Sequence, residues 1–473
     1  EEIEQKLQKL GYENNFTKTF NGLGSEILNI AKIPNAIDQP SISETDRFKL
    51  TQIIDLLIDK AIEVNPNYMQ NYLEFCATCP NDLKATFAEN KEEYDDKISK
   101  YPYRRDSFAL MDKFRALHIP CLDGKTWVRS QQELFIANTL FINGIDFIYE
   151  KPLVKESITI NPDFYFPEIN CWYEHYAVDL SGKSPFGEDY EIGHVKKEEF
   201  YESHNLDHFS TNLYDYKKGN IEEKIFDELK KRGIERNLRS QNEIEQSIQE
   251  IYKDNVKQLL GEMILHFKES NLSKNEFLIE IERLDDQTRA QKFRKIFIPL
   301  LEAYQNRLRT KGTIDFSDQI IKAIDILEKN THQEVKSYLN LKYLLIDEFQ
   351  DLSKNRGKLI EAILALNTES KLFGVGDDWQ SIYRFSGSDI SFVTNFKNKF
   401  FSKNSSIKFI GETHRFPEEI SNVASRFIQR NPEQLPKIVK TTRTGGKISF
   451  CEIENYKIQS IKRGVVVFKT RTK

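Results

Sequence analysis

The sequence lacks long apolar runs, a cysteine framework and an excess of charge, and each absence excludes a class of protein. No stretch approaches the ~20 apolar residues that a membrane-spanning helix needs, and no signal peptide opens the chain, which predicts a cytoplasmic protein. Five cysteines in 473 residues are too few for a disulfide-stabilised scaffold. Lysine and arginine (68) nearly balance aspartate and glutamate (73), so the net charge of −5 does not by itself predict a nucleic-acid partner. What remains is a globular chain long enough for two to four domains.

Three cysteines and one histidine have a spacing that could bind zinc. Cys76-x-x-Cys79 and His118-x-x-Cys121 would together supply three thiolates and one imidazole. The stretch "YLEFCATCP", however, has the pattern of the end of an amphipathic helix, where cysteine packs as a small apolar residue. Core packing is the interpretation that we prefer.

The stretch "LLIDEFQDLSK" (344–354) is the strongest indication of chemistry in this chain. Its apolar residues predict a buried parallel strand, and Asp347 and Glu348 follow at the tip of that strand. Carboxylates in such a position hold Mg2+ and activate a water molecule beside a nucleoside triphosphate. A solvated acidic turn after a core strand is the simpler alternative.

A nucleotide site of this kind also needs a phosphate loop, G-x-x-x-x-G-K-[ST], between a strand and a helix. The stretch "IPCLDGKTW" has isoleucine at the first glycine position and no strand before it. The stretch "AVDLSGKSPFG" follows a predicted strand, but proline and glycine come next, and we expect no helix before about residue 195. Because the N-terminus of a helix must face the phosphates, we expect neither stretch to be a phosphate loop.

Two further motifs follow the acidic strand tip. They are "FGVGDDWQSIYRFSGSD" (373–389) and "ETHRF" (412–416). In this order and spacing the motifs resemble those of the UvrD/Rep-like superfamily 1 DNA helicases, in particular the helicase IV branch, as does "RFIQRNP". The stretch "TKTFNGLGSEIL" resembles a segment that follows the phosphate loop in that family. The resemblance covers about residues 1–115 and 236–473, and it implies ATP and Mg2+ as cofactors, DNA (single strands and duplex junctions) as the partner, and movement from 3′ to 5′.

The resemblance also implies roles for individual residues. Asp347 would bind Mg2+, Glu348 would activate the attacking water, and Gln380 would sense the γ-phosphate. Arg415 would contact the nucleotide and stabilise charge on the transferring phosphate, and His414 stands where a tyrosine commonly packs on adenine. The residues expected to stack on bases of single-stranded DNA are Tyr383 and Phe385.

The family keeps its phosphate loop upstream of such a segment, so we expect this chain to be part of a larger helicase and to lack ATPase activity alone. The expected fold class is α/β, with a partial RecA-like P-loop ATPase core, a helical accessory domain and an inserted restriction-endonuclease-like domain. Near the N-terminus, "FTKTFNGLGSEILNIAKIP" predicts a strand, a glycine turn and a helix. The expected domains are a partial RecA-like segment with a helical accessory domain (1–115), the insert (116–235), the second helical part (236–310), the RecA-like core (311–435) and the start of a second RecA-like domain (436–473).

The predicted insert carries a second group of acidic residues. Asp163, in "NPDFYF", and Glu174, in "CWYEHYAV", belong to adjacent predicted strands, so both carboxylates could bind Mg2+. With Glu133 on the preceding helix they resemble the PD-(D/E)xK nuclease arrangement, as found in modules inserted into helicase IV-like proteins. Tyrosine stands at the usual lysine position, and we expect Lys196 or Lys197 to supply that charge.

Simpler interpretations exist for these residues as well. Ser130-x-x-Glu133 has the pattern of a capping box, and Pro162-Asp163 is a common turn pair. The alternative function is therefore a non-catalytic DNA-binding scaffold with a degenerate nuclease insert. The intact motif residues favour an ATP- and Mg2+-dependent DNA helicase coupled to a DNA nuclease.

Overall fold

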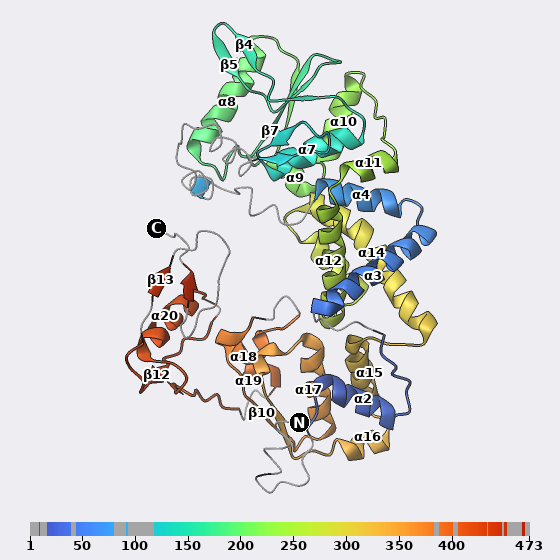
Figure 1. Ribbon diagram of the computed structural model, residues 1–473, viewed down its shortest axis with the longest axis vertical. Helices are drawn as coiled ribbons and strands as arrows, with labels where there is room; N and C mark the ends of the chain where they lie inside the picture. The colour runs from blue at the N-terminus through green and yellow to red at the C-terminus, as the bar shows by residue number, and fades with distance from the viewer. Residues whose placement is uncertain are drawn as a thin grey trace. The chain divides into compact units, whose positions relative to one another are not determined.

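The chain forms two compact units in the computed structural model (Figure 1). Unit 1 contains the chain up to residue 35, residues 269–271 and the chain from residue 316 onward, and unit 2 contains residues 36–268 and 272–315. No helix of the described residues is long and apolar enough to cross a membrane. The structure describes residues 9, 17–38, 44–79, 91–92, 118–382, 387–400, 405–432, 434–446, 449–451 and 466–468.

Unit 1 is built around a pair of parallel strands, β9 and β10, with Leu345 opposite Phe373. Helix α17 connects the two strands, as a parallel pair requires, and α15 packs against both α2 and α17. Ile346, Phe349 and Ile360 are buried in the core of this region. The bounds are α2 (Phe20–Ile30), α15 (Phe316–Lys329), α16 (Gln333–Tyr338), β9 (Tyr343–Ile346), the 3-10 turn η2 (Phe349–Asp351), α17 (Lys354–Leu366), β10 (Lys371–Gly374) and the 3-10 turn η3 (Asp378–Gln380).

The glycine-containing segment near the N-terminus is helical. The hydroxyl of Thr19 accepts a hydrogen bond from the N–H of Gly22 at 3.0 Å and so caps α2, which begins at Phe20. Gly24 lies within the helix, and a Cβ atom there would be 3.3 Å from the carbonyl oxygen of Gln319 on α15. The predicted strand and glycine turn are therefore wrong for the described residues 17–30, because this glycine permits close packing of two helices and not a turn.

The last part of unit 1 combines short strands with one longer helix. Strand β11 pairs in parallel with β12, and α20 packs beside β12. Pro417 is the N-cap of α20, and the hydroxyl of Ser421 donates to the carbonyl of Val439 at 3.1 Å. The bounds are α18 (Ser391–Thr394), α19 (Phe396–Phe400), β11 (Glu412–Thr413), α20 (Glu418–Ile428), β12 (Lys440–Thr441), β13 (Ser449–Cys451) and β14 (Val466–Phe468).

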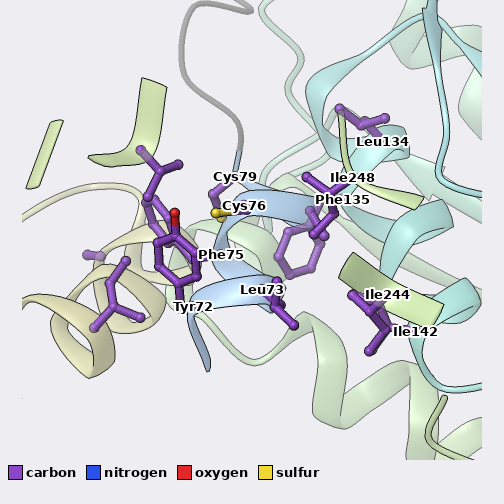
Figure 2. Packing of buried hydrophobic residues seen from close by; sticks show 14 of the residues in the cluster. Tyr72, Leu73, Phe75, Cys76, Cys79, Leu134, Phe135, Ile142, Ile244 and Ile248 are labelled. Atoms are coloured by element: carbon purple, nitrogen blue, oxygen red, sulfur yellow. The ribbon is translucent and has the colours of Figure 1, made fainter. Parts of the chain in front are cut away.

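The helices of unit 2 share one apolar core with its largest sheet. The long helix α14 packs against α3, α4, α9 and α13. Figure 2 shows Tyr72 and Phe75 of α4 in the same buried cluster as Phe135 of α7 and Ile244 of α11. The bounds of these helices are α3 (Glu44–Val64), α4 (Tyr68–Thr78), α11 (Gln241–Ser247), α12 (Glu250–Glu269), α13 (Lys274–Glu282) and α14 (Gln287–Lys311).

The cysteines of the predicted zinc pattern lie inside this core. Cys76 and Cys79, at the end of α4, are fully buried (Figure 2), and Cys121 is buried as well. Burial raises the pKa of the Cys76 thiol to about 12 and that of the Cys79 thiol to about 11, so both stay protonated near neutral pH. The cysteines therefore pack as small apolar residues, as the pattern of α4 predicts.

The largest sheet of unit 2 has the strand order β3-β6-β7-β8, with β8 parallel to β7 and the other neighbours antiparallel. Neighbouring residues of β7 face opposite sides: Tyr173 lies in the shared core with Phe135 of α7, and Trp172 lies in a separate cluster with Tyr201 of α8. Helices α7 and α8 therefore cover opposite faces of this sheet (Figure 1). The bounds are β1 (Ile119–Pro120), β2 (Trp127–Val128), α7 (Gln131–Ile142), β3 (Ile148–Tyr149), β4 (Leu153–Lys155), β5 (Ile158–Ile160), β6 (Phe164–Phe166), β7 (Cys171–Tyr176), α8 (Glu188–Ser203), β8 (His208–Asn212), α9 (Leu213–Lys218) and α10 (Ile221–Lys231).

Helix α8 begins earlier than the sequence predicts, at Glu188 and not near residue 195. Gly187 precedes it with φ 90°, a conformation that a residue without a side chain adopts readily. Three acidic residues in the first turn complement the positive end of the helix dipole. The predicted start is wrong because Pro185 and Gly187 end the loop before the helix and do not interrupt it.

Candidate functional site

The carboxyl ends of β9 and β10 bring two of the predicted motifs together. Because these strands are parallel, both ends lie at the same edge of the sheet. The backbone N–H of Val375 donates to the carbonyl of Ile346 at 2.8 Å, and the N–H of Phe349 donates to the carbonyl of Val375 at 2.8 Å. These bonds hold the acidic pair Asp347 and Glu348 beside the loop that follows β10.

Glu348 has a left-handed backbone conformation, with φ 50° and ψ 46°. This conformation costs a non-glycine residue on the order of 1 kcal/mol, and such residues concentrate at functional sites. The N–H of Glu348 donates to Oδ1 of Asp347 at 3.0 Å, which stabilises the turn locally. Both residues are exposed. The residue with the strained backbone, Glu348, is thus the residue predicted to activate water.

Hydrogen bonds connect Glu348 to Gln380 through two other residues. Gln350 Nε2 donates to Glu348 Oε2 at 2.6 Å, and the N–H of Asp377 donates to Gln350 Oε1 at 2.9 Å. Gln380 Nε2 donates to Asp377 Oδ2 at 2.7 Å. Gly376 makes room for this arrangement, since a Cβ atom there would lie 2.8 Å from Gln350 Oε1. One network therefore contains both the predicted base and the predicted γ-phosphate sensor.

Two other residues of the predicted nucleotide site, Arg415 and His414, do not belong to this network. Arg415 follows β11, its side chain is exposed, and its N–H donates to Thr413 Oγ1 at 3.3 Å. His414 is also exposed, and within the described part of the chain neither residue forms a hydrogen bond or ion pair with the network. The residues expected to stack on DNA bases, Tyr383 and Phe385, lie outside the described residues.

A second acidic site lies in unit 2, where β6 begins beside β7. The N–H of His175 donates to Asp163 Oδ2 at 2.7 Å, and Glu174, the preceding residue of β7, is 1% exposed. Burial raises the pKa of both carboxyl groups, and the negative charges of Glu174 and Glu133 raise the pKa of Asp163 further. A cation bound between these groups would relieve the repulsion.

Two residues of α8 hold the carboxylate of Glu174. Lys197 Nζ donates to Glu174 Oε2 at 2.9 Å, and the hydroxyl of Tyr201 donates to Oε1 at 2.9 Å. Residues four apart lie on one face of a helix, so α8 presents both groups to β7. Lys196 is exposed and Tyr176 is buried. The positive charge at this site therefore comes from Lys197 of α8 and not from the strand.

Glu133 forms only half of the predicted capping box. Its N–H donates to Ser130 Oγ at 3.0 Å, as a cap requires. Its carboxylate does not return a bond to Ser130: Oε2 accepts from the N–H of Arg129 at 3.0 Å and from the hydroxyl of Tyr149 at 2.6 Å. The negative charge of Glu133 also raises the pKa of Asp163. The contacts thus agree with a helix-start role and with a place at the edge of the acidic site.

A buried polar network on the other face of β7 supports the acidic site, and no local pattern in the sequence predicts it. His175 lies within hydrogen-bond distance of Gln132 Oε1 (Nε2, 2.7 Å) and of Thr211 Oγ1 (Nδ1, 2.8 Å), and Tyr173 reaches the same hydroxyl at 2.6 Å. Burial lowers the pKa of His175 to about 4, so the ring is neutral near pH 7. The network fixes the backbone at His175, whose N–H holds Asp163.

Neither phosphate-loop candidate presents free backbone N–H groups in the way that a phosphate requires. In "AVDLSGKSPFG", the N–H groups of Ser181 and Lys183 donate to Asp179 Oδ1 at 2.8 Å and 3.0 Å. In "IPCLDGKTW", Asp123 Oδ1 accepts two N–H groups of its own loop in the same way. Carboxylates of the chain thus occupy donors that would have to face phosphate.

The donor set around Asp163 and Glu174 fits Mg2+ if water or backbone oxygen completes the coordination. Across the described ranges, no three His, Cys, Asp or Glu side chains come together as a metal site by themselves. Mg2+ commonly binds one or two carboxylates and keeps several water molecules, so two carboxylates are enough. Burial raises the pKa of both carboxyl groups, and the charges of Glu174 and Glu133 raise that of Asp163 further, while the charge of Lys197 opposes the shift at both.

Replacement of Asp163 by asparagine should stabilise the metal-free protein at high pH. A carboxyl group whose pKa is raised in the folded state contributes stability at low pH, and that contribution is lost as the pH rises through the raised pKa. Asparagine can still accept the hydrogen bond from His175 but carries no charge. We therefore expect the gain to be small below about pH 4, where the carboxyl group is protonated in both the folded and the unfolded state, and to grow as the pH rises toward about 8.

Thermal unfolding in the presence of a chelator, compared with unfolding in excess Mg2+, tests this expectation. Mg2+ should raise the melting temperature of the parent protein and leave that of the Asp163→Asn variant unchanged, because only the parent can bind the ion. The exposed Asp146 provides a matched control as Asp146→Asn, which should behave as the parent. Equal stabilisation of parent and Asp163→Asn by Mg2+ would contradict the metal site.

Comparison with known protein families provides independent evidence on the segment that contains the network from Glu348 to Gln380. Residues 194–401 match the UvrD/REP helicase N-terminal domain. This range includes Glu348 and Gln380 and begins within α8, so Glu133, Asp163 and Glu174 lie outside it. The predicted resemblance to UvrD-like helicases is confirmed for this part of the chain.

Individual relatives agree with the family match. The chain is 38% identical to DNA helicase IV of Escherichia coli (strain K12) over 167 residues, which is 35% of this chain and 23% of that protein. It is 30% identical over 171 residues to the ATP-dependent DNA helicase PcrA of Staphylococcus epidermidis, or 36% of this chain and 23% of PcrA. PcrA of Staphylococcus aureus (strain Mu50) is 32% identical over 151 residues, or 32% of this chain and 20% of that protein. The chain thus spans about a quarter or less of the length of these curated relatives.

Proposed function

We propose that this chain is part of an ATP- and Mg2+-dependent DNA helicase that moves from 3′ to 5′ on DNA. One observation carries the proposal: the network from Glu348 through Gln350 and Asp377 to Gln380 lies at the carboxyl ends of two parallel strands, inside the segment that matches the helicase domain. Ligands bind at this edge of open α/β sheets. The substrate that fits the relatives' printed names is DNA, with single strands and duplex junctions as the proposed forms.

The residues of the network divide the work of ATP hydrolysis between them. Glu348 accepts the proton of the attacking water, and Gln350 orients the Glu348 carboxylate by donating to Oε2. Asp347 provides an exposed carboxylate for the Mg2+ that accompanies ATP, and the bound ion supplies charge neutralisation at the phosphates. Gln380 is exposed, so its amide can reach a γ-phosphate. In this proposal Arg415 approaches the same phosphate, and His414 contacts the nucleotide.

An unwinding assay with tailed duplexes tests the proposed function and polarity. In the full-length protein, ATP and Mg2+ should drive separation of a duplex with a single-stranded 3′ tail at least about tenfold faster than one with a 5′ tail, because a translocating helicase loads on one strand. A fluorescently labelled strand reports the separation. ATP without Mg2+ is the control. Failure to separate either duplex would contradict the helicase assignment, and a preference for the 5′ tail would contradict only the polarity.

We further propose that the acidic site of unit 2 cleaves DNA, and a specific observation favours this second function. Asp163 and Glu174 lie together with raised pKa values, and Lys197 donates to Glu174. In the proposal both carboxylates bind Mg2+, which would lower the pKa of its water and provide hydroxide near neutral pH. Lys197 stabilises charge on the phosphate, and Glu133, at the rim, accepts or orients a proton. The insert (116–235) is then a nuclease domain coupled to the helicase.

A further inference from the structure

Lys437 binds the two consecutive aspartates that precede Gln380. It lies in the segment between α20 and β12, and its side chain is 16% exposed. Lys437 Nζ donates to Asp377 Oδ1 at 2.6 Å and forms an ion pair with Asp378 Oδ1 as well. Asp377 uses its other carboxylate oxygen to accept Gln380 Nε2. The carboxylate of Asp377 thus connects Lys437 to the side-chain amide of Gln380, which we propose to contact the γ-phosphate.

Other contacts fix the segment of Lys437 against the same turn. Asp378 is 1% exposed, and its Oδ2 accepts the N–H of Leu435 at 2.8 Å. The indole N–H of Trp379 donates to the carbonyl of Leu435 at 3.1 Å, and Lys437 Nζ lies 5.1 Å from the centre of the Trp379 ring. These contacts involve every residue from Asp377 to Trp379. The segment before β12 is therefore docked specifically on the loop that follows β10.

The charge of Lys437 determines what Asp377 can do. Burial alone would raise the pKa of Asp377, but the hydrogen bonds from Lys437 and Gln380 and the charge of Lys437 lower it below the usual value. Asp377 is therefore a carboxylate, which can only accept hydrogen bonds. Because Oδ1 is taken by Lys437, Oδ2 faces Gln380 and accepts one N–H of its amide. Within the described part of the chain the second N–H and Oε1 of Gln380 form no hydrogen bond, so a ligand can contact them.

We propose that Lys437 is a positioning residue for Gln380 and that the segment before β12 is in this way part of the ATP-hydrolysis site. The proposal rests on the proposed helicase function and deepens it, since it assigns control of the γ-phosphate contact to a residue 57 positions further along the chain. Lys437 does not touch the nucleotide in this proposal. It acts through Asp377, by keeping that carboxylate charged and turned so that the Gln380 amide has one orientation.

A purely structural role makes different predictions from a positioning role. If Lys437 only neutralises the buried Asp378, its loss destabilises the fold, and its effect on hydrolysis adds to that of any other substitution. If Lys437 positions Gln380, its loss lowers kcat for ATP with little change in KM, and it has no further effect once Gln380 is removed. A thermodynamic cycle with Gln380→Ala separates these cases because coupled residues are not additive.

The experiment measures DNA-stimulated ATP hydrolysis of the full-length protein with Lys437→Met, Gln380→Ala and the double variant. We expect Lys437→Met to lower kcat about 10- to 100-fold, the range of small misplacements of a reacting group, and to leave KM within about threefold. In the Gln380→Ala background the same change should alter kcat less than about twofold. Lys437→Arg, which keeps the cation, should restore kcat to within about threefold of the parent.

Two further variants keep the result interpretable. Lys437→Met combined with Asp378→Asn removes the buried Asp378 charge together with the lysine that neutralises it, so we expect the protein to stay folded. Asp377 still loses its cation in this double variant, and kcat should therefore remain low. Lys399→Met removes a different lysine–aspartate pair of unit 1, to Asp389 at 3.7 Å, and should leave kcat unchanged. Additive losses in Lys437→Met and Gln380→Ala, or a normal kcat for Lys437→Met, would overturn the inference.

The same data distinguish failure of this inference from failure of the proposed function. If Glu348→Gln leaves hydrolysis at the parental rate, the nucleotide site itself is misassigned and the inference falls with it. If Glu348→Gln stops hydrolysis but Lys437→Met hydrolyses ATP normally, the helicase site stands and only the role of Lys437 is wrong.

Discussion

Alanine in place of Asp163 or Glu174 should abolish Mg2+-dependent DNA cleavage by the full-length protein while ATP hydrolysis stays near the parental rate. Each substitution removes a carboxylate that we assign to the metal, and the remaining one would have to hold the ion alone. We expect cleavage to fall on the order of 10³-fold or more, because the metal-bound water is lost as a nucleophile. Cleavage of labelled single-stranded and duplex DNA, measured beside ATPase activity, gives both readouts in one preparation.

Neighbouring residues supply matched controls for this experiment. Lys197→Ala should slow cleavage about 10- to 100-fold with a smaller effect on Mg2+ affinity, since an ammonium stabilises charge but does not bind the ion. Lys196→Ala changes the adjacent exposed lysine and should be silent. Glu133→Gln should reduce cleavage if Glu133 belongs to the site, and should be silent if it serves only as a cap. Full cleavage by the Asp163 and Glu174 variants would leave the insert as a structural or DNA-guiding module.

Glutamine in place of Glu348 should stop ATP hydrolysis and unwinding while ATP binding remains nearly intact. Glutamine keeps an oxygen that can accept from Gln350, so the network survives and only the proton acceptor is lost. A fall on the order of 10³-fold in kcat is the expected size for a general base. Binding of a fluorescent ATP analogue, measured beside hydrolysis, separates the two effects. Glu361→Gln, on the exposed face of α17, is the control and should hydrolyse ATP normally.

Arg415→Ala tests the one catalytic residue of the proposed ATP site that does not contact the network from Glu348 to Gln380 in the described part of the chain. We expect hydrolysis to slow on the order of 10³-fold or more if the arginine reaches the transferring phosphate when ATP is bound. ATP affinity should change much less, since the interaction forms mainly in the transition state. If the Glu348 and Arg415 variants both unwind DNA at the parental rate, the assignment of these motifs is wrong.

The sequence predicted the end of β9, the motif positions and the start of α7 because each has a short-range signal. The prediction that β9 is buried is wrong for most of the strand, since Tyr343 and Leu345 are exposed and Ile346 is buried. An apolar run followed by acidic residues predicts the end of β9, and Ser130 before "QQELF" predicts the start of α7. The start of α2 was missed because glycine usually marks a turn, whereas Gly24 here permits contact with α15. The start of α8 was missed because proline and glycine lie just before it.

The parts of the sites that were not predicted depend on contacts between distant residues. Local pattern could not choose between Lys196 and Lys197, because the choice depends on how α8 is rotated against β7. Gln350 belongs to the stretch "LLIDEFQDLSK", but the two hydrogen bonds of its side-chain amide could not be predicted, because one of them depends on where the loop after β10 lies. Lys437 gave no signal at all: its partners lie 59 and 60 positions earlier in the chain.

The apolar core of unit 2 limits how this protein can be divided into working parts. Tyr72 and Phe75 of α4 pack in one continuous cluster with Phe135 of α7 and Tyr173 of β7. A fragment that carried only the insert would leave one face of α7 in water and would tend to aggregate. Heating should melt the sheet and the surrounding helices in a single cooperative step. The proposed nuclease site therefore depends on these helices and could not be transferred to another protein without them, and a substitution that loosens the helices should weaken the proposed cleavage from a distance.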